Sequence, residues 1–480
     1  MKQYLCIDAG TTIIKAGLVD EAGNLTAMAH RTLSTERPQP GFCEMDMEGL
    51  WETVCQVLLE LRQMCGPQWD QIAALGVSGQ GEGAWLLDES LRPVRNAILW
   101  NDTRSDTIGS QLWSLAGEFC RERHLTPLCK GSCLAILHWM KRNEPDHYHQ
   151  IRHILYCKDW IHFKLTGSIQ TDYTDASTAA FHIFEKAYQW ELFDMLQLEE
   201  IKQALPTPYP SGQRVAVTGV ETEETLGIPL GTPVAAGALD VAATAAGLGV
   251  SRPGEKGSIL GTSLANLLVL SEEQAKAENF NGGSVLCHAA PKTYLRQMSS
   301  LSGTQVLDWC RKEIADGLSF GEMEAMARSV PAGSQGVVFL PYLFGERAPF
   351  QSSTVCAGFH GLRAIHEKRH LIRAVYESLA YVLFDCCRHM PSGSGVRHMA
   401  GGGARSNLLC SMISDVTGEI ICRTRHQELG LMGLYRILSG AAPAASWETE
   451  SFTPDAANRA VYAHQFEIFK DLQRRYMDME

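Results

Sequence analysis

Two corners rich in glycine and threonine, one in each half of the chain, have the composition of phosphate-binding loops. The first occupies residues 8–12 (Asp-Ala-Gly-Thr-Thr), and the second occupies residues 261–263 (Gly-Thr-Ser). Glycine lets backbone N–H groups approach an anion closely, and threonine hydroxyls add further donors. Either corner alone is better explained as an ordinary hairpin turn. As a pair, the two corners favour binding of the phosphate groups of a nucleotide. The candidate phosphate ligands are Gly10, Thr11, Thr12, Gly261 and Thr262.

Asp8 stands at the start of the first corner, where its negative charge prevents it from binding phosphate directly. A carboxylate in this place suits a hydrated Mg²⁺ ion, which neutralises phosphate charge. We therefore expect Asp8 to lie near a metal ion. The alternative is that Asp8 only caps the turn of a hairpin.

A third glycine-rich segment, residues 401–403, lies between a short strand-like run and a helical pattern. Ser406 has the residue type of an N-cap, the apolar positions within 408–416 share one helical face, and Gly418 ends the pattern. Glycines at a helix N-terminus leave room for a flat base or ribose against the backbone. A flexible joint is the alternative, but the ordered cap and helix favour a binding role.

Asp240 stands where a strand-like run ends and an alanine-rich helical run begins. A carboxylate in this place can accept a proton, and an unperturbed Asp, with a pKa of about 3.9, is ionised at neutral pH. Asp is also common at helix starts for purely structural reasons. Taken alone, the position favours the structural interpretation.

Five polar or aromatic residues gather on two loops that follow predicted strands. Gln80 and Glu82 lie on a glycine-rich loop, and Trp100, Asp102 and Arg104 lie on the second loop. Such side chains can bind and orient hydroxyls, while the indole ring packs on the carbon face of a sugar. Each loop alone could be solvated, with Asp102 and Arg104 forming a surface pair. Together they suit a polyhydroxylated ligand, and the anionic Glu82 favours a neutral sugar over a sugar acid.

The phosphate corners need strands to hold them. Apolar, β-branched runs at 4–7 and 13–19 flank the first corner, and similar runs at 257–260 and 264–270 flank the second. Both arrangements predict a hairpin. The recurrence of a hairpin and its corner once per half indicates a weak internal repeat, although two unrelated hairpins could share a common turn.

Helices and strands alternate between the two corners. The spacing of apolar residues predicts a helix over 50–61, and residues 72–78 have the pattern of a buried strand. This mixture is typical of α/β domains. Length, repeat and composition together predict two domains, residues 1–245 and 246–480.

The composition of the 480-residue chain limits its partners and its location. A net charge of −12 argues against nucleic-acid binding and against anionic membranes. Neither a signal peptide nor an apolar run of the roughly 20 residues that a membrane helix needs is visible. The 15 cysteines are scattered and lack any C-x-x-C pair, unlike disulfide frameworks or zinc sites. We expect a reduced, cytoplasmic protein.

The order of these motifs along the chain resembles the FGGY carbohydrate kinases of the actin-like ATPase superfamily. The resemblance runs from Tyr4 to about Gly440. Besides the corners and loops above, it includes the segments 40–46, 158–160, 165–167, 171–172, 175–177, 237–240, 341–349 and 401–406. The ordered set is far more specific than any single motif.

The resemblance implies two actin-like (ribonuclease H-like) α/β domains that close on ATP and Mg²⁺, with the sugar held by the N-terminal domain. It implies that Asp240 is the catalytic base and that Asp8 is the carboxylate near the metal. It also implies nucleotide contacts by Lys15, Gly261, Thr262, Gly402, Gly403 and Asn407.

Two segments depart from the family pattern. Residues 136–139 (Ile-Leu-His-Trp) lack the usual Lys, and residues 81–83 (Gly-Glu-Gly) stand where xylulose kinases usually carry Met-His-Gly. The loop that contains residues 81–83 looks more similar to the branch that holds L-xylulose and erythritol kinases. The resemblance therefore implies ATP-dependent phosphorylation of a pentulose of the xylulose or L-xylulose type, or of a short polyol such as erythritol, and it leaves a homodimer open. A non-catalytic sugar sensor and an actin-like nucleotide-binding protein are the alternatives.

Overall fold

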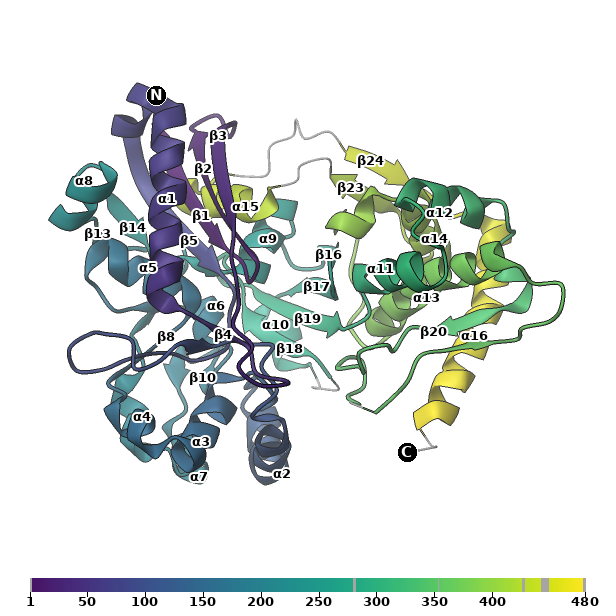
Figure 1. Cartoon of the computed structure of the whole chain (residues 1–480), viewed down its shortest axis with the longest axis horizontal. Helices are drawn as coiled ribbons and strands as arrows, with labels where there is room; N and C mark the ends of the chain where they lie inside the picture. Colours follow the sequence, from purple (N-terminus) through teal and green to yellow (C-terminus); the bar gives the residue numbers. More distant parts are fainter. Residues whose placement is uncertain (1, 279–281, 353, 425–427, 442–448, 478–480) are drawn as a thin grey trace.

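The first predicted hairpin forms the centre of a seven-stranded sheet in the N-terminal half (Figure 1). The structure is a computed structural model that describes residues 2–278, 282–352, 354–424, 428–441 and 449–477. The strand order is β13 (Arg214–Val217), β14 (Pro233–Ala235), β5 (Ile72–Gly79), β1 (Gln3–Ala9), β2 (Ile13–Asp20) and β3 (Leu25–Thr32), and β15 (Ala238–Leu239) also pairs with β5. β1 runs antiparallel to β2 and parallel to β5. The predicted hairpin and the strand over 72–78 are confirmed.

The second predicted hairpin forms the centre of a seven-stranded sheet in the C-terminal half. Its order is β18 (Ser284–Cys287), β19 (Tyr294–Ser300), β17 (Leu264–Leu270), β16 (Lys256–Leu260), β22 (Arg397–Ala400), β23 (Ile421–Thr424) and β24 (Thr449–Phe452). As in the first sheet, the first hairpin strand, β16, pairs antiparallel with the second and parallel with a later strand, β22. This shared pattern supports the internal repeat.

Helices cover both sheets. On the first sheet, α1 (Met47–Cys65), which contains the predicted helix over 50–61, buries Leu50, Val54, Leu58 and Leu61 and packs on β2 and β3. α5 (Cys157–Thr166) packs on β5, and α8 (Val220–Leu226) lies against α1. The C-terminal half is built on α11 (Thr304–Glu313), α12 (Phe320–Arg328), α13 (Lys368–Arg388), α14 (Asn407–Thr417) and α16 (Ala456–Met477).

A smaller lobe, inserted between β5 and β13, has an apolar core of its own and lies below the first sheet in Figure 1. Its helices are α2 (Asp106–Glu122), α3 (Cys133–Asn143), α4 (Pro145–Gln150), α6 (Tyr173–Ala176) and α7 (Trp190–Met195). Its short strands include β6 (Trp85–Leu87), β7 (Ala97–Ile98), β8 (His153–Leu155) and β9 (Thr171–Asp172). β4 (Glu44–Met45), which comes before β5 in the chain, pairs with β7. None of the helices in the described part of the chain combines the length and the apolar composition that crossing a membrane requires.

Two helices pack tightly against each other beside the first sheet: α9 (Asp240–Leu248) and α15 (Leu429–Ser439). A Cβ at Gly433 would lie 1.8 Å from the Ala243 carbonyl oxygen, and a Cβ at Gly247 would lie 2.0 Å from the Leu429 carbonyl oxygen. Only glycine permits this approach of two backbones. α15 also packs on β1 and β5, so a late segment of the chain contributes to the core of the N-terminal half. The predicted boundary at 245 falls inside α9 and stays a prediction.

Candidate functional site

Two carboxylates lie at one edge of the first sheet, where three neighbouring strands end. Asp8 is close to the end of β1, Asp240 begins α9 directly after β15, and Ser78 of β5 pairs in register with both β1 and β15. The Ser78 hydroxyl donates a hydrogen bond of 2.7 Å to Asp8 Oδ1. Since these strands are parallel, their carboxyl ends meet at one edge, which is where ligands bind in open α/β sheets.

Burial and nearby negative charges raise the pKa values of both carboxylates. Burial raises the pKa of Asp240 to about 7, and the charges of Asp8 and Glu82 act in the same direction. The Val241 N–H, which donates to Asp240 Oδ1 at 2.6 Å, acts against this rise. Burial also raises the pKa of Asp8, opposed by the Ser78 hydroxyl and by Lys15. The expectation of an unperturbed Asp240 is therefore wrong, because a sequence does not show how deeply the carboxylate is buried or which charges lie near it.

A buried charge cluster supports the short strand β15, which directly precedes Asp240. The Lys158 ammonium contacts Asp159, Asp172 and Asp175, and all four side chains are at most 1 % exposed. Asp172 Oδ2 accepts a 2.7 Å hydrogen bond from the Thr174 hydroxyl. That hydroxyl oxygen in turn accepts the Leu239 N–H at 2.8 Å. The residue before Asp240 is thus tied to the cluster, whose residues belong to the segments 158–160, 171–172 and 175–177.

The first corner is joined to the sugar loops by a chain of hydrogen bonds. The Trp100 indole N–H donates to Thr11 Oγ1 at 3.0 Å, and the Thr11 hydroxyl donates to Gln80 Oε1 at 3.0 Å. Gln80 is buried, whereas Thr11 and Trp100 are half-buried. The structure thus brings Gln80 and Trp100 together as predicted. It ties the Thr11 hydroxyl, which was expected to bind phosphate, to the sugar loops.

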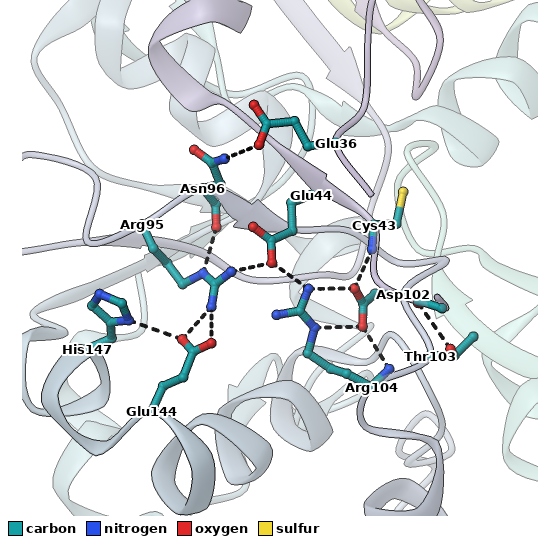
Figure 2. A network of polar contacts seen from close by, with 11 residues as sticks. Glu36, Cys43, Glu44, Arg95, Asn96, Asp102, Thr103, Arg104, Glu144 and His147 are labelled. Atoms are coloured by element: carbon teal, nitrogen blue, oxygen red, sulfur yellow. Dashed lines mark hydrogen bonds and ion pairs between the residues drawn. The ribbon is translucent and has the colours of Figure 1, made fainter. Parts of the chain in front are cut away.

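Asp102 and Arg104 form a buried network rather than an open hydroxyl-binding surface (Figure 2). Asp102 is fully buried; its Oδ2 accepts the Cys43 N–H at 2.6 Å and Arg104 Nη2 at 2.8 Å. Its Oδ1 accepts the Arg104 backbone N–H at 2.8 Å and Arg104 Nε at 2.9 Å. The Arg104 guanidinium also pairs with Glu44 and lies 3.9 Å from the ring centroid of Phe42.

These contacts correct the prediction for Asp102, whereas a substrate contact by Arg104 stays a prediction, because its buried Nη1 has no hydrogen-bond partner in the described part of the chain. Both carboxylate oxygens of Asp102 are already used by protein donors, so the side chain is not available to bind a sugar hydroxyl. The suggested surface pair is wrong for the same reason, because the two side chains are at most 1 % exposed. Glu44 extends the network to Arg95 and onward to Glu144 (Figure 2). The network holds the loop that presents Trp100.

Glu82 has an unusual backbone conformation for a non-glycine residue, with φ of 57°. Such left-handed positions are costly and cluster at functional sites. Burial raises the pKa of Glu82, whereas the positive charge of Arg347 lowers it. Sequence reasoning missed Arg347 as a site residue, although the segment 341–349 that contains it was part of the resemblance.

The glycine loops of the second sheet leave space where the nucleotide is expected. The Gly261 corner connects β16 to β17, and residues 401–403 follow β22 on the neighbouring strand. A Cβ at Gly401 would lie 2.5 Å from the Leu260 carbonyl oxygen, whereas a Cβ at Gly402 would meet open space. Gly402 is exposed and Gly403 is buried, so the backbone offers a bare surface beside α14.

The caps of α14 match the prediction. Ser406 Oγ accepts the Leu409 N–H, and Gly418 ends the helix in the left-handed conformation. Asn407 begins this helix, and its Oδ1 accepts a 2.8 Å hydrogen bond from Arg423 Nη2. A nucleotide contact by Asn407 would therefore use its amide nitrogen.

Lys15 already has a partner. Its ammonium forms a 2.7 Å ion pair with Glu428, just before α15, and lowers the pKa of Asp8. A contact between Lys15 and a phosphate therefore stays a prediction, and it would require Lys15 to be shared with Glu428.

Asp8 fits a magnesium ion that is held mainly by other ligands. Within the described residues, no group of three or more His, Cys, Asp or Glu side chains is placed to hold a metal. Mg²⁺ usually keeps several waters and binds one or two carboxylates together with substrate phosphates. A single carboxylate at the strand edge, Asp8, is consistent with that mode.

Comparisons with known proteins cover nearly the whole chain. The N-terminal domain of the FGGY family of carbohydrate kinases matches residues 3–247, and the C-terminal domain of that family matches residues 257–439. The chain is 28% identical over 487 residues to a probable L-xylulose kinase from Pasteurella multocida, covering 98% of each chain. It is 27% identical over 503 residues to an L-xylulose/3-keto-L-gulonate kinase from Escherichia coli, covering 98% of this chain and 97% of that one. A xylulose kinase structure from Brucella ovis superposes with a TM-score of 0.92 at 26% identity, covering all of both chains.

Proposed function

The chain belongs to the FGGY family of carbohydrate kinases, and from this premise we propose that it transfers the γ-phosphoryl group of ATP to a terminal hydroxyl of a pentulose. The preferred substrates are of the xylulose or L-xylulose type, with a short polyol such as erythritol as the next candidate. The observation that carries the proposal is the placement of Asp8, Ser78 and Asp240 at one strand edge, beside the loop of Gln80.

Asp240 acts as the general base. A base works best when its pKa lies near the working pH, and burial brings the pKa of Asp240 to about 7. Its Oδ1 is oriented by the Val241 N–H, which leaves Oδ2 to accept the proton of the substrate hydroxyl. The oxygen then attacks the γ-phosphorus in line with the leaving ADP oxygen, as phosphoryl transfer requires.

The remaining residues position the two substrates and neutralise charge. Backbone N–H groups around Gly10 and Gly261 bind the phosphates from opposite domains, and the glycines 402 and 403 face the nucleoside. Asp8 would hold Mg²⁺, which when bound neutralises the phosphate oxygens. Closure of the two domains on both substrates excludes water and so limits wasteful ATP hydrolysis.

Gln80, Glu82 and Trp100 bind the sugar. Trp100 offers an apolar face, and its ring is fixed through Thr11 to Gln80. Asp102 and Arg104 hold the Trp100 loop from within the protein. This arrangement supports a small polyhydroxylated substrate and gives the two residues a role that needs no contact with it.

The test is ADP release with a panel of D- and L-pentuloses, erythritol and the matching aldonates. We expect sugar-dependent turnover that is highest for a neutral four- or five-carbon compound. A non-catalytic sensor would bind a sugar without ADP release, and an actin-like nucleotide-binding protein would hydrolyse ATP at the same rate with and without sugar. An aldonate or an already phosphorylated sugar as the best substrate would contradict the proposed substrate class.

A further inference from the structure

A basic side chain from the C-terminal domain reaches the sugar loops. Arg347 lies between β20 (Val338–Leu340) and β21 (Gly358–His360), and the carbon of its guanidinium lies 5.7 Å from the ring centroid of Trp100. This distance is within the range of a cation–π contact. Arg347 of the second domain therefore lies within cation–π range of an aromatic ring of the first.

The backbone of Arg347 is fixed by a buried carboxylate. Glu346 is 2 % exposed, and its Oε1 accepts the N–H groups of Arg347 at 2.8 Å and Leu301 at 2.9 Å. Its Oε2 accepts the Ser300 hydroxyl at 2.6 Å. The Arg347 side chain is anchored as well, since Nε donates to the Ser299 carbonyl oxygen at 3.0 Å. A side chain that is held at its backbone and at Nε loses little freedom when it binds a ligand.

The two terminal nitrogens of Arg347 are not used by the protein. Among the hydrogen bonds and ion pairs of the described residues, those of the Arg347 side chain involve Nε alone. The guanidinium is a rigid fork of donors, so both terminal N–H₂ groups remain available for oxygen atoms of a ligand.

Glu82 faces the same space with the opposite charge. Its carboxylate makes neither a hydrogen bond nor an ion pair within the described residues. Burial raises the pKa of Glu82, and the positive charge of Arg347 opposes this rise. Two opposite charges that influence each other without pairing leave room between them. Arg347 lies beside Trp100, and Glu82 lies on the loop of Gln80, which is joined to Trp100 through Thr11, so that room is part of the sugar pocket.

We propose that Arg347 is a substrate-binding residue that closes the sugar pocket from the C-terminal domain, with its terminal N–H groups on a substrate oxygen opposite Glu82. The inference rests on the proposed function and extends it in one respect. Arg347 balances the charge of Glu82, and this balance decides whether the site takes neutral sugars or sugar acids. Removing Glu82 alone leaves a free cation that attracts a carboxylate, and removing Arg347 alone leaves a free anion that repels it.

The experiment compares Arg347→Gln, Arg347→Lys and Glu82→Gln with the wild type, and uses the half-exposed Arg31→Gln as a matched control. Steady-state kinetics are measured on the best neutral sugar of the panel and on its aldonate, together with ADP affinity by calorimetry and thermal melting. Losing a charge-assisted hydrogen bond should raise the sugar KM about 10- to 100-fold in Arg347→Gln, with ADP affinity within about twofold. Arg347→Lys keeps the charge but loses the forked donor geometry, so its sugar KM should lie between those of the wild type and Arg347→Gln. Glu82→Gln should shift the preference at least about tenfold toward the aldonate.

The outcomes separate the two claims. A wild-type protein that phosphorylates no sugar of the panel overturns the proposed function and with it the inference. A wild type that is active, beside a folded Arg347→Gln variant with an unchanged sugar KM, overturns the inference alone. Equal losses of sugar and ADP affinity, or a Glu82→Gln variant with unchanged preference, also overturn it. If Arg347→Gln does not fold, Arg347→Lys decides by the same criteria.

Discussion

Replacing Asp240 with Asn should make the protein more stable, and the gain should grow with pH. Burial holds the pKa of Asp240 at about 7 in the folded protein, against an ordinary value of 3.8. Between these two pH values the folded protein keeps a proton that the unfolded chain has lost, so the wild type loses stability as the pH rises through this window. Across the whole window, the wild type loses at most about 4 kcal/mol in the free energy of unfolding. The loss above about pH 5 is at most about 3 kcal/mol.

Asp240→Asn removes the titrating group but keeps an oxygen for the Val241 N–H. Urea denaturation of both proteins, without nucleotide or metal, gives the free energy of unfolding between about pH 5 and pH 8. We expect the difference, variant minus wild type, to rise up to about pH 7 and then to level off. The exposed Asp308→Asn variant serves as the control and should show a flat difference. A flat difference for Asp240→Asn, or a variant that is less stable near pH 8, would refute the assignment of a raised pKa to a buried charge.

Three further substitutions test the parts around this carboxylate. Lys158→Met removes the cation that contacts three buried carboxylates, so urea denaturation should show that the free energy of unfolding falls by about 3–5 kcal/mol. A decrease of less than about 1 kcal/mol would contradict the role of the cluster. Asp102→Asn weakens the hold on Arg104, so we expect a lower melting temperature together with a higher sugar KM; a changed KM with unchanged melting would indicate direct sugar contact instead. Gly402→Ala places a methyl group in the open space where the nucleoside is proposed to bind, so the KM for ATP should rise several-fold while the melting temperature stays unchanged. An unchanged KM would show that the nucleotide does not bind beside Gly402.

Local patterns predicted much of the framework. The two hairpins, their glycine corners, the Ser406 cap and the position of Asp240 at a helix start depend on residues within a few positions of one another. Turn and cap signals of this kind act over short distances, so they are visible in a sequence.

What could not be predicted depends on contacts between distant parts of the chain. Arg104 pairs with Glu44, which is 60 positions away in the chain. Because the sequence does not show this contact, Asp102 and Arg104 looked like a surface pair, whereas they belong to a buried network. α15 packs on β1 from the opposite end of the sequence, and Arg347 reaches Trp100 from the other domain. The raised pKa of Asp240 has the same origin, because Asp8 and Glu82 come from two other segments.

The rate of phosphoryl transfer in Asp240→Asn, with sugar and ATP both saturating, tests most directly the claim that Asp240 accepts the hydroxyl proton. General-base catalysis contributes about 10²–10⁴-fold, so kcat should fall by that factor while the KM for ATP changes little. The Asp308→Asn control should keep the wild-type kcat. An Asp240→Asn variant that is folded by its melting curve and retains a kcat near that of the wild type would contradict the account.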